Sequence, residues 1–559
     1  MRSSGSPAEV GFSLPPVKVL IFHGYLLRGT GSNVYNASLA TALARLGHEV
    51  HLLCQDRHAG ELPWVDRVGS WDGGPLGVEP AGGASGPGTV TAYRPDIGDL
   101  LPVYVADEYA GFSVKTFSDL SEAELERYLD ANVAAVRDVV QRLGGADAAL
   151  ANHLVMGPAI LARAGLRFAV KIHGSALEYT VKPHPERFLP YAREGIDGCA
   201  GVLVGSGHTA GSLWRALDDP QVPAKTRLGP PGVDTELFAR IPRSESATRV
   251  RGLADALEAE AGSPAGERAA TDLGMPGSAW DRNPNRGAAA LRLWAEAPGP
   301  RVAFVGKLIV SKGIDLLLAA WPLVHAAHPG ARLLVVGFGE YELAAMRLWT
   351  AVQAAERGLV RQIAVRGRGL EGGEEAPLKM LSAFLDHLPA GFWGAATKAA
   401  GTVAFAGRLE HEEVGRLVPA ADALVMPSTF PESFGMVAAE AAAAGVPTVS
   451  AAHSGMAEVS QALAEELPTE AAEAVSFALD EHAVESLAAR IKGWLGLDPD
   501  VRERAVSALQ KVAAGRWSWD GVARGVLAAS AGRLDELLPP HVPAATSSNP
   551  GAGGGTAEQ

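Results

Sequence analysis

The clearest signal for the fold of this chain is PSTFPESFGMVAAEAAAAGVP, residues 427–447. An apolar strand pattern ends near Ser428, a short loop carries Pro431 and Glu432, and an alanine-rich helix pattern runs on to Gly445. The next apolar run, GVPTVSAA (445–452), has the composition of another buried strand. This order of strand, loop, helix and strand predicts a parallel sheet covered by helices.

The same alternation occurs in both halves of the chain, separated by helix patterns such as residues 121–143, which begin with the capping sequence Ser-Glu-Ala-Glu. Short apolar runs typical of buried parallel strands are VKVLIFH (17–23), HEVHLLC (48–54), AALANH (148–153), FAVKIH (168–173), GVLVGS (201–206), RVAFVGKL (301–308), ARLLVVGFG (331–339), GTVAFAGRL (401–409) and DALVMPS (422–428). Two such series predict an α/β chain with two Rossmann-like, doubly wound parallel-sheet domains.

Composition suggests where these domains begin and end. We expect a disordered N-terminus (1–16), an N-terminal domain (17–240), an irregular and partly helical insertion or linker (241–300), a C-terminal domain (301–515), a closing helix (516–538) and a disordered tail (539–559). A second insertion covers about residues 356–400. Its EGGEE run (371–375) is expected to be exposed.

Charge and composition exclude several classes of protein. Of 559 residues, 47% are hydrophobic and 20% charged, which excludes a wholly disordered chain. The 49 basic and 63 acidic side chains give a net charge of −14, which argues against a nucleic-acid partner. No apolar run approaches the roughly 18 residues that span a bilayer, so we expect no transmembrane segment. The run Val19 to Phe22 is too short for a signal peptide, and we expect a cytoplasmic protein. Cys54 and Cys199 are expected to be reduced and buried.

An anion site is predicted at the start of the helix in 427–447. The backbone amides of Ser433, Phe434, Gly435 and Met436 would point out of the helix N-terminus, and Gly435 would let a phosphate approach. Glu432 and Glu440 are eight residues apart, or about 12 Å along a helix axis, which suits a ligand with a polyhydroxyl group at each end. Taken alone, these two acids are equally compatible with a helix-start acid and a solvated helix residue.

A second candidate site follows the strand that begins the C-terminal domain. In VGKLIVSKG (305–313), the strand ends at Gly306, and Lys307 and Lys312 follow before an apolar helix. Two lysines at the carboxyl end of a parallel strand can neutralise a diphosphate. In isolation, ordinary surface lysines explain the pattern equally well.

The N-terminal half offers weaker signals. The run Gly29-Thr30-Gly31-Ser32-Asn33-Val34 lacks the third glycine of a dinucleotide fingerprint, but its loop, and Gly31 in particular, can approach a phosphate or an acceptor. His173 ends the strand FAVKIH, and Asn152 and His153 end AALANH, so these side chains can line one cleft.

Together these residues resemble glycosyltransferase family 4, nucleotide-sugar enzymes with the two-domain GT-B architecture. The similarity covers about residues 17–240, 300–350 and 401–538, and its most specific part is the pair Glu432 and Glu440 within PESFGMVAAEAAAAGVP. The run RWSWDGVARGVL (516–527) is similar to the family's closing helix, which crosses back to the first domain. The resemblance therefore implies two domains that face each other across a cleft, with the acceptor on the N-terminal side.

The resemblance also implies roles for the matching residues. Glu440 would hold the nucleotide ribose, and Glu432 the hydroxyls of the transferred sugar. The amides of residues 433–436, with Gly31 and Gly306, would lie at the sugar and the diphosphate. His173 matches the histidine near the transferred sugar.

The two lysines carry one departure from the family pattern. Lys312 matches the family's phosphate-binding lysine, whereas Lys307 stands where an arginine is usual, which keeps the charge but loses the planar fork. A second departure is HSGMAE (453–458), which has Ser454 in place of the first glycine of the usual Gly-Gly-x-x-Glu.

The implied reaction retains the anomeric configuration and uses no metal. We therefore expect a hexosyltransferase whose co-substrate is a nucleotide-diphosphate sugar, with an unidentified hydroxyl acceptor and no other cofactor. The one Asp-x-Asp motif, Asp498-Pro499-Asp500, lies between late helices, away from any predicted strand end.

Other functions stay open at this point. An epimerase or hydrolase acting on nucleotide-sugars would use the same fold. An NAD-dependent oxidoreductase would need an acid after the second strand, where Asp56 stands, although the missing third glycine counts against it. A sensor that binds nucleotide-sugars without catalysis is a further alternative.

Overall fold

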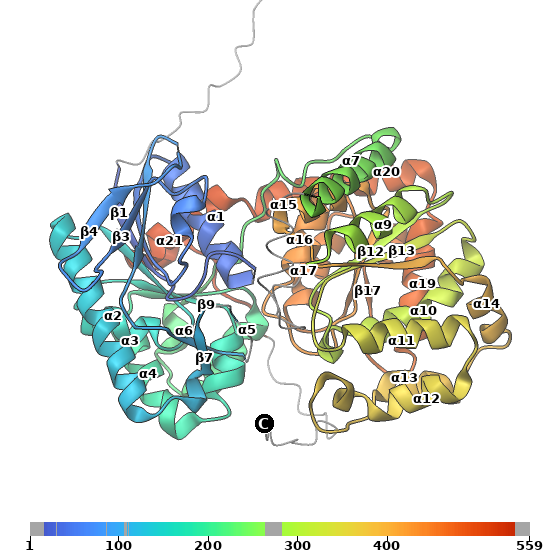
Figure 1. Ribbon diagram of the computed structural model, residues 1–559, viewed down its shortest axis with the longest axis horizontal. Coiled ribbons are helices and arrows are strands. Elements are labelled where there is room, and N and C mark those ends of the chain that lie inside the picture. Colours follow the sequence, from blue (N-terminus) through green and yellow to red (C-terminus); the bar gives the residue numbers. More distant parts are fainter. Residues whose placement is uncertain are drawn as a thin grey trace, which may run out of the picture.

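The computed structural model describes residues 16–29, 31–84, 86–105, 109, 111–262 and 282–542. They form two lobes joined by the chain's crossings between them (Figure 1). The expected disordered ends, 1–16 and 539–559, lie outside the described residues except for residue 16 and residues 539–542.

The N-terminal domain is built on a nine-stranded sheet. The strands, in spatial order, are β11 (Thr226–Leu228), β10 (Gly201–Val204), β9 (Ala169–Ile172), β8 (Ala148–Asn152), β1 (Lys18–Phe22), β2 (Glu49–Leu53), β5 (Thr89–Arg94), β3 (Arg67–Ser70) and β4 (Gly77–Pro80). All neighbours pair in parallel except β3 and β4. The chain winds outward in both directions from β1, so the order reverses between β1 and β8.

Helices pack on this sheet, and a small pair of strands adjoins it. The helices are α1 (Gly31–Arg45), α2 (Glu122–Leu143), α3 (Gly157–Arg163), α4 (Pro185–Gly198), α5 (Gly207–Leu217) and α6 (Val222–Lys225), and the pair is β6 (Leu100–Val103) with β7 (Ser113–Thr116). Local sequence explains α2, because Ser121 and Glu124 form the expected capping box and Gly144 ends the helix in a left-handed conformation.

The C-terminal domain is built on a six-stranded, fully parallel sheet. Its order is β14 (Val403–Gly407), β13 (Arg332–Val336), β12 (Arg301–Val305), β15 (Ala423–Met426), β16 (Thr448–Ala451) and β17 (Ser476–Phe477). The order reverses between β12 and β15. The predicted α/β class with two doubly wound parallel sheets is therefore confirmed.

The helices of this domain cover both faces of the sheet, and some of them form a further group on one side of it. They are α7 (Arg243–Ala261), α9 (Pro284–Ala295), α10 (Ile314–Ala327), α11 (Glu342–Gln353), α12 (Arg357–Arg366), α13 (Lys379–Asp386), α14 (Phe392–Lys398), α15 (His411–Leu417), α16 (Met436–Ala443), α17 (Ser454–Ala464), α18 (Thr469–Ala472), α19 (Ala483–Leu495) and α20 (Pro499–Arg516). The lower right of Figure 1 shows α11 to α14 grouped beside α10.

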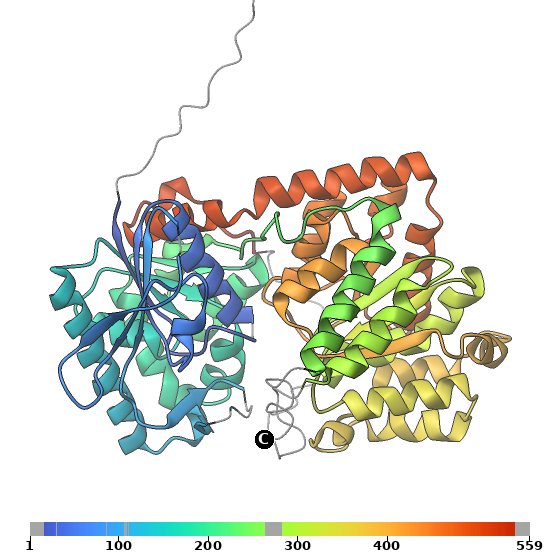
Figure 2. The ribbon, with the colours of Figure 1, turned by 45° about the horizontal axis from the view of Figure 1, so that its top comes forward.

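The chain returns to the N-terminal domain through two tryptophans. Trp517 is buried in the core of the C-terminal domain, and Trp519 is buried in the core of the N-terminal domain. Helix α20 ends at Arg516, just before the first tryptophan, and α21 (Trp519–Ser530) begins at the second. Figure 2 shows α20 along the top of the C-terminal lobe leading to α21 on the other lobe. The amide of Val233 donates to the carbonyl of Trp517 at 2.7 Å, so both crossings of the chain lie side by side.

Two segments differ from expectation. Residues 241–300 were expected to be an irregular and partly helical segment, and their described parts form two regular helices, α7 and α9, which pack on each other and supply Trp294 and Leu253 to the core of the C-terminal domain. Five of the glycines and prolines that suggested irregularity lie in 263–281, outside the described residues, and most of the others lie at or beyond the ends of the two helices, whose Ala- and Arg-rich stretches are good helix formers. The EGGEE run is exposed at residues 372–375, but Glu371 is not, because it accepts a hydrogen bond from the amide of Val310.

Trp519, the first residue of α21, completes the core of the N-terminal domain, and its substitution tests this placement. The Trp519 ring lies 5.5 Å from the ring of Tyr35, and a Cβ on Gly232 would come within 2.5 Å of it. Trp519→Ala should lower the free energy of unfolding by about 3–5 kcal/mol, because it leaves a large cavity. Urea unfolding followed by circular dichroism measures the change.

The matched control for that substitution is Leu343→Ala, at a side chain that is 80% exposed. It should change the free energy of unfolding by no more than about 0.5 kcal/mol. Equal effects of the two substitutions would contradict the placement of Trp519.

Candidate functional site

A cleft of about 610 Å³ is lined by both domains and contains the predicted site residues except Asn152, which is bonded to the lining residue His173. The predicted residues that line it are Gly31, His153, His173, Gly306, Lys307, Lys312, Glu432, Ser433, Phe434, Gly435, Met436 and Glu440. Both sheets present to this cleft the loops at the point where their strand order reverses, which lies after β1 and β8 in one domain and after β12 and β15 in the other. Ligands of open α/β sheets bind at such points.

The lysine loop follows β12. After Gly306 and Lys307, a short 3-10 turn from Val310 to Lys312 brings the second lysine into the cleft, and Gly313 begins α10 with a left-handed φ of 68°. The carboxylate of Glu371 accepts the amide of Val310 at 2.7 Å. Glu371 belongs to the segment 356–400, so this insertion helps to position the turn that carries Lys312.

Lys312 and Glu432 form an ion pair within the cleft. The Ser428 hydroxyl donates to the same Glu432 oxygen at 2.8 Å, and the Glu432 amide donates to the Ser454 hydroxyl at 2.9 Å. Burial raises the pKa of Glu432, but the charge and hydrogen bond of Lys312 outweigh it and leave the pKa below its usual value. The predicted phosphate-binding lysine and sugar-binding acid are thus partners of each other in this structure.

The amides after Glu432 are arranged differently from the expected helix terminus. Helix α16 begins only at Met436, and Gly435 precedes it with φ of 116°. Glu432 therefore lies in the loop, so the spacing of about 12 Å calculated for a continuous helix does not apply. The backbone amides of residues 433–437 have no acceptor among the described residues. The Phe434 ring packs against Trp517, so only its backbone can serve a ligand.

Glu440 lies on α16 and is almost fully buried. Its carboxylate is 2.8 Å from Nε2 of His411, at the start of α15. Burial lowers the pKa of His411, but the Glu440 carboxylate outweighs that effect and leaves the pKa above its usual value of 6.5. His411 also lines the cleft and was missed by the sequence analysis, although it follows the strand run 401–409 closely.

Arg408 is a second residue that the sequence analysis missed. It follows β14 directly, lines the cleft, and is ion-paired with Glu410 at 2.9 Å. Its guanidinium and the Lys307 ammonium lie 5.7 Å and 5.9 Å from the centre of the same Phe338 ring. Position 307 has a lysine where the resembled family has an arginine, and Arg408 supplies a guanidinium nearby, at the end of another strand. The criterion that identified the lysines, a basic residue directly after a strand, would also have identified Arg408.

On the N-terminal side, His173 follows β9 and belongs to a buried hydrogen-bond chain. Its Nε2 donates to Asn152 Oδ1 at 2.8 Å, and the Asn152 amide donates to Asn36 Oδ1 at 2.8 Å. Burial lowers the pKa of His173 well below its usual value, and the neighbouring His153 and Lys171 lower it further. His173 is therefore neutral near pH 7, with its proton on Nε2 and Nδ1 left as an acceptor.

Two more buried polar residues line this side. Lys171, on β9, donates to the carbonyl of Gly229 at 2.5 Å, and burial lowers its pKa to about 7. Neither ring nitrogen of His153 has a hydrogen-bond partner among the described residues. Both side chains were weak or absent as sequence candidates, because a lone lysine or histidine in a strand pattern has no distinctive spacing.

The two domains touch around the cleft. The Ser433 hydroxyl donates to the carbonyl of His173 at 2.6 Å. Glu458 of α17 accepts the amides of Gly207 and His208, each at 2.8 Å, at the N-terminus of α5. A Cβ on Gly31 would lie 3.8 Å from the sulfur of Met436, so the first glycine-bearing loop faces the start of α16.

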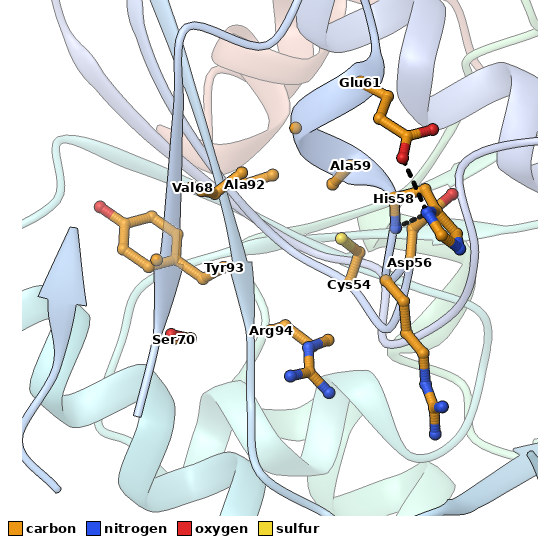
Figure 3. A pocket seen from close by; sticks show the side chains of 13 residues that line it. Cys54, Asp56, His58, Ala59, Glu61, Val68, Ser70, Ala92, Tyr93 and Arg94 are labelled. Atoms are coloured by element: carbon orange, nitrogen blue, oxygen red, sulfur yellow. Dashed lines mark hydrogen bonds and ion pairs between the residues drawn. The ribbon is translucent and has the colours of Figure 1, made fainter. Parts of the chain in front are cut away.

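A second, smaller pocket of about 240 Å³ bears on the oxidoreductase alternative. It lies at the ends of β2, β3 and β5 and includes Asp56, which Figure 3 shows beside His58. The Asp56 carboxylate accepts the amide of Leu27 at 3.2 Å and that of His58 at 2.9 Å. Asp56 therefore holds two loops together, and each of its carboxylate oxygens already accepts a backbone hydrogen bond.

The described part of the chain offers neither a metal-binding cluster nor a membrane-spanning helix. No group of three or more His, Cys, Asp or Glu side chains there is arranged to hold a metal ion. Within the same residues, every helix is too short or too polar to cross a membrane. Cys54 and Cys199 are buried free thiols, as expected.

Known proteins with similar sequences and folds agree with this geometry. Residues 395–511 match the family model described as Glycosyl transferases group 1. A D-inositol 3-phosphate glycosyltransferase of Segniliparus rotundus is 33% identical over 260 residues, covering 46% of this chain and 44% of the relative. A sucrose-phosphate synthase structure from Thermosynechococcus elongatus aligns with a TM-score of 0.50 at 17% identity, covering 93% of this chain and 98% of that chain. A glycosyltransferase structure from Rickettsia africae aligns with a TM-score of 0.52 at 14% identity, covering 92% and 98%.

These similarities settle the fold and the broad resemblance. The two-domain architecture is the GT-B fold, as expected. The expected similarity to glycosyltransferases is confirmed at the level of group 1, and the assignment to family 4 in particular stays a prediction. The match spans less than half the length of the curated relative.

The pair of His411 and Glu440 predicts a pH dependence of stability. Because folding raises the pKa of His411, its contribution is fully present below about pH 6.5 and is lost as the pH rises through the raised pKa. His411→Gln should therefore lower the urea midpoint more at about pH 6 than at about pH 9. Paired urea titrations at both values measure this difference.

The matched control is His387→Gln, at an exposed histidine whose ring contacts only the carbonyl of Ala383 among the described residues. The change that His387→Gln causes in the urea midpoint should be the same at both pH values. A loss for His411→Gln that is equal at the two pH values would contradict the assignment.

Proposed function

We propose that this protein is a retaining, metal-independent glycosyltransferase that moves a hexosyl group from a nucleotide-diphosphate sugar to an acceptor hydroxyl. The observation that carries the proposal is a cationic centre, made by Lys307, Lys312, Arg408 and unpaired backbone amides, set in one cleft with two carboxylates. The group 1 family match and the curated relative support the reaction class.

The donor would lie along the C-terminal side of the cleft. Its diphosphate would meet the two lysines and the amides of residues 433–437, because helix starts and fixed cations favour a dianion. Glu440 would accept hydrogen bonds from the ribose, with His411 fixing its carboxylate. Glu432 would accept hydrogen bonds from the hexose, while the Lys312 ammonium would pair with both Glu432 and the phosphate.

In the proposed step, the bond from the anomeric carbon to the diphosphate oxygen breaks and the nucleotide diphosphate leaves with the electron pair. The acceptor oxygen bonds to the anomeric carbon from the same face, and its proton passes to an oxygen of the leaving phosphate. Lys307, Lys312 and Arg408 would stabilise the negative charge that grows on that phosphate, which is the part a divalent cation takes in other enzymes.

His173 would serve the transferred sugar as a hydrogen-bond acceptor. The neutral ring, oriented by Asn152, can accept a hydrogen bond from a sugar hydroxyl at Nδ1 without adding positive charge beside the oxocarbenium-like sugar. The cytoplasmic location expected from the sequence stays a prediction.

The charge argument leads to a direct kinetic test. A thermal-shift screen of UDP-, GDP- and ADP-sugars identifies the donor, because a bound ligand raises the melting temperature.

With that donor, Lys312→Met should lower kcat about 10²–10³-fold. Glu440→Gln should weaken nucleotide binding about tenfold or more in calorimetry, because it removes a charged hydrogen-bond acceptor. Lys312→Arg should recover part of the activity.

The matched control is Lys379→Met, at an exposed lysine on α13 outside the cleft, which should leave kcat and affinity unchanged. Product analysis with and without acceptor separates transfer from epimerisation or hydrolysis. Normal turnover in Lys312→Met would refute the assigned centre. Absence of binding to every nucleotide-sugar would refute the proposed function.

A further inference from the structure

The two sides of the cleft differ sharply in charge. The C-terminal side contributes the lysines, the arginine and the two glutamates described above. Among the described lining residues of the N-terminal side, Lys171 is the one side chain of a charged type, and the others are aromatic, aliphatic, small or histidine. In the proposed transferase this N-terminal side would receive the acceptor.

Lys171 is not placed to receive an anion. Its side chain is 2% exposed, its ammonium donates to the Gly229 carbonyl, and it lies 5.3 Å from the centre of the Tyr35 ring. Arg28, on the neighbouring loop, is directed to the carbonyl of His58 at 3.4 Å and is not part of the lining. A phosphate held on this side would therefore lose water without gaining a cation.

Aromatic rings form much of the wall instead. Tyr25, Tyr104 and Tyr179 line it, together with Val105. Tyr179 and Val105 keep 45% and 46% of their surface exposed, although large apolar side chains are usually covered. The Tyr179 ring is stacked at 5.7 Å on Phe430 of the opposite domain. The accessible surface of Tyr179, and of the half-buried Tyr25, suits the CH face of a ligand ring.

His153 adds a hydrogen-bonding group of matching chemistry. It is 2% exposed, both of its ring nitrogens are unpaired within the described chain, and its ring lies 4.8 Å from that of His173. A neutral imidazole offers one donor and one acceptor. A hydroxyl group also offers both, so an acceptor alcohol would satisfy this buried residue close to the sugar-binding histidine.

We propose that the acceptor is an uncharged, hydroxylated ring compound, whose ring stacks on the tyrosines and whose hydroxyl pairs with His153, and that phosphorylated acceptors are rejected. This inference rests on the proposed function. It separates the chain from its curated relative, whose name specifies a phosphorylated inositol.

The test compares acceptors that share a ring but differ in charge. With the donor found by thermal shift, kcat/KM is measured for myo-inositol and methyl glucoside, for 4-nitrophenyl glucoside, and for inositol 3-phosphate and glucose 6-phosphate. Binding is measured in parallel by saturation-transfer NMR. We expect at least one neutral compound to exceed its phosphorylated counterpart about 100-fold. Comparison of 4-nitrophenyl glucoside with methyl glucoside and myo-inositol shows whether the site prefers an acceptor with an aromatic aglycone or a plain sugar or cyclitol.

Variants of residues that line the N-terminal side of the cleft test whether this side determines the selectivity for acceptors. Tyr179→Ala should raise the acceptor KM about fivefold to tenfold with little change in the donor KM, and Tyr179→Phe, which keeps the ring, should not. Val105→Arg should raise kcat/KM for the phosphorylated acceptor about tenfold by supplying the missing cation. Leu343→Ala, at an exposed side chain on α11 outside the cleft, is the control and should leave both unchanged.

The outcomes are distinct. A phosphorylated acceptor that equals or exceeds its neutral partner overturns the inference, as does failure of every neutral compound to bind while the donor is still cleaved. Failure of the protein to bind or cleave any donor overturns the proposed function itself.

Discussion

The structure depends above all on balancing charge inside the cleft between the two domains. Lys312 and Glu432 neutralise each other there, and each comes from a loop at the carboxyl end of a parallel strand. Those strands, β12 and β15, are hydrogen-bonded neighbours at the point where the sheet order reverses. The fold therefore brings together two charges that are 120 residues apart in the chain. An anionic ligand that bound Lys312 would share this lysine with Glu432, which would couple binding of the ligand to the position of the acid.

A second constraint is how the two domains are joined. Trp517 and Trp519, two residues apart, are buried in different cores, so the backbone between them is held at both ends. The earlier crossing is tied to the same point by the bond between Val233 and Trp517. Contacts between the domains beside these crossings include the polar ones of Ser433 and Glu458 and the stacking of Tyr179 on Phe430. The paired crossings and these contacts together set how the two domains face each other across the cleft.

Much of this arrangement could be predicted because its signals are local. Strand runs such as 17–23 and 422–428 are short and apolar, and the helix from Ser121 carries its own capping box, so these elements formed where expected. Residues 241–300 were expected to be irregular because glycine and proline are frequent there, yet most of the described ones flank the two helices and do not interrupt them. Arg408 was missed although it directly follows a strand, which is the signal that identified the lysines, and His411 was missed because a lone histidine has no distinctive spacing. The pairing of Lys312 with Glu432 was missed because it depends on which strands become neighbours.

By itself, the sequence determined the two βα series, the loops that follow each strand, and the residue types available at those loops. Hydrophobic periodicity and glycine placement act over a few residues, so they can be recognised without knowing the fold. Only the tertiary structure decided which loops face one another, that Glu432 precedes its helix, and that Lys171 is buried while Tyr179 is exposed. These features follow from strand order and domain packing, which depend on contacts between residues far apart in the chain.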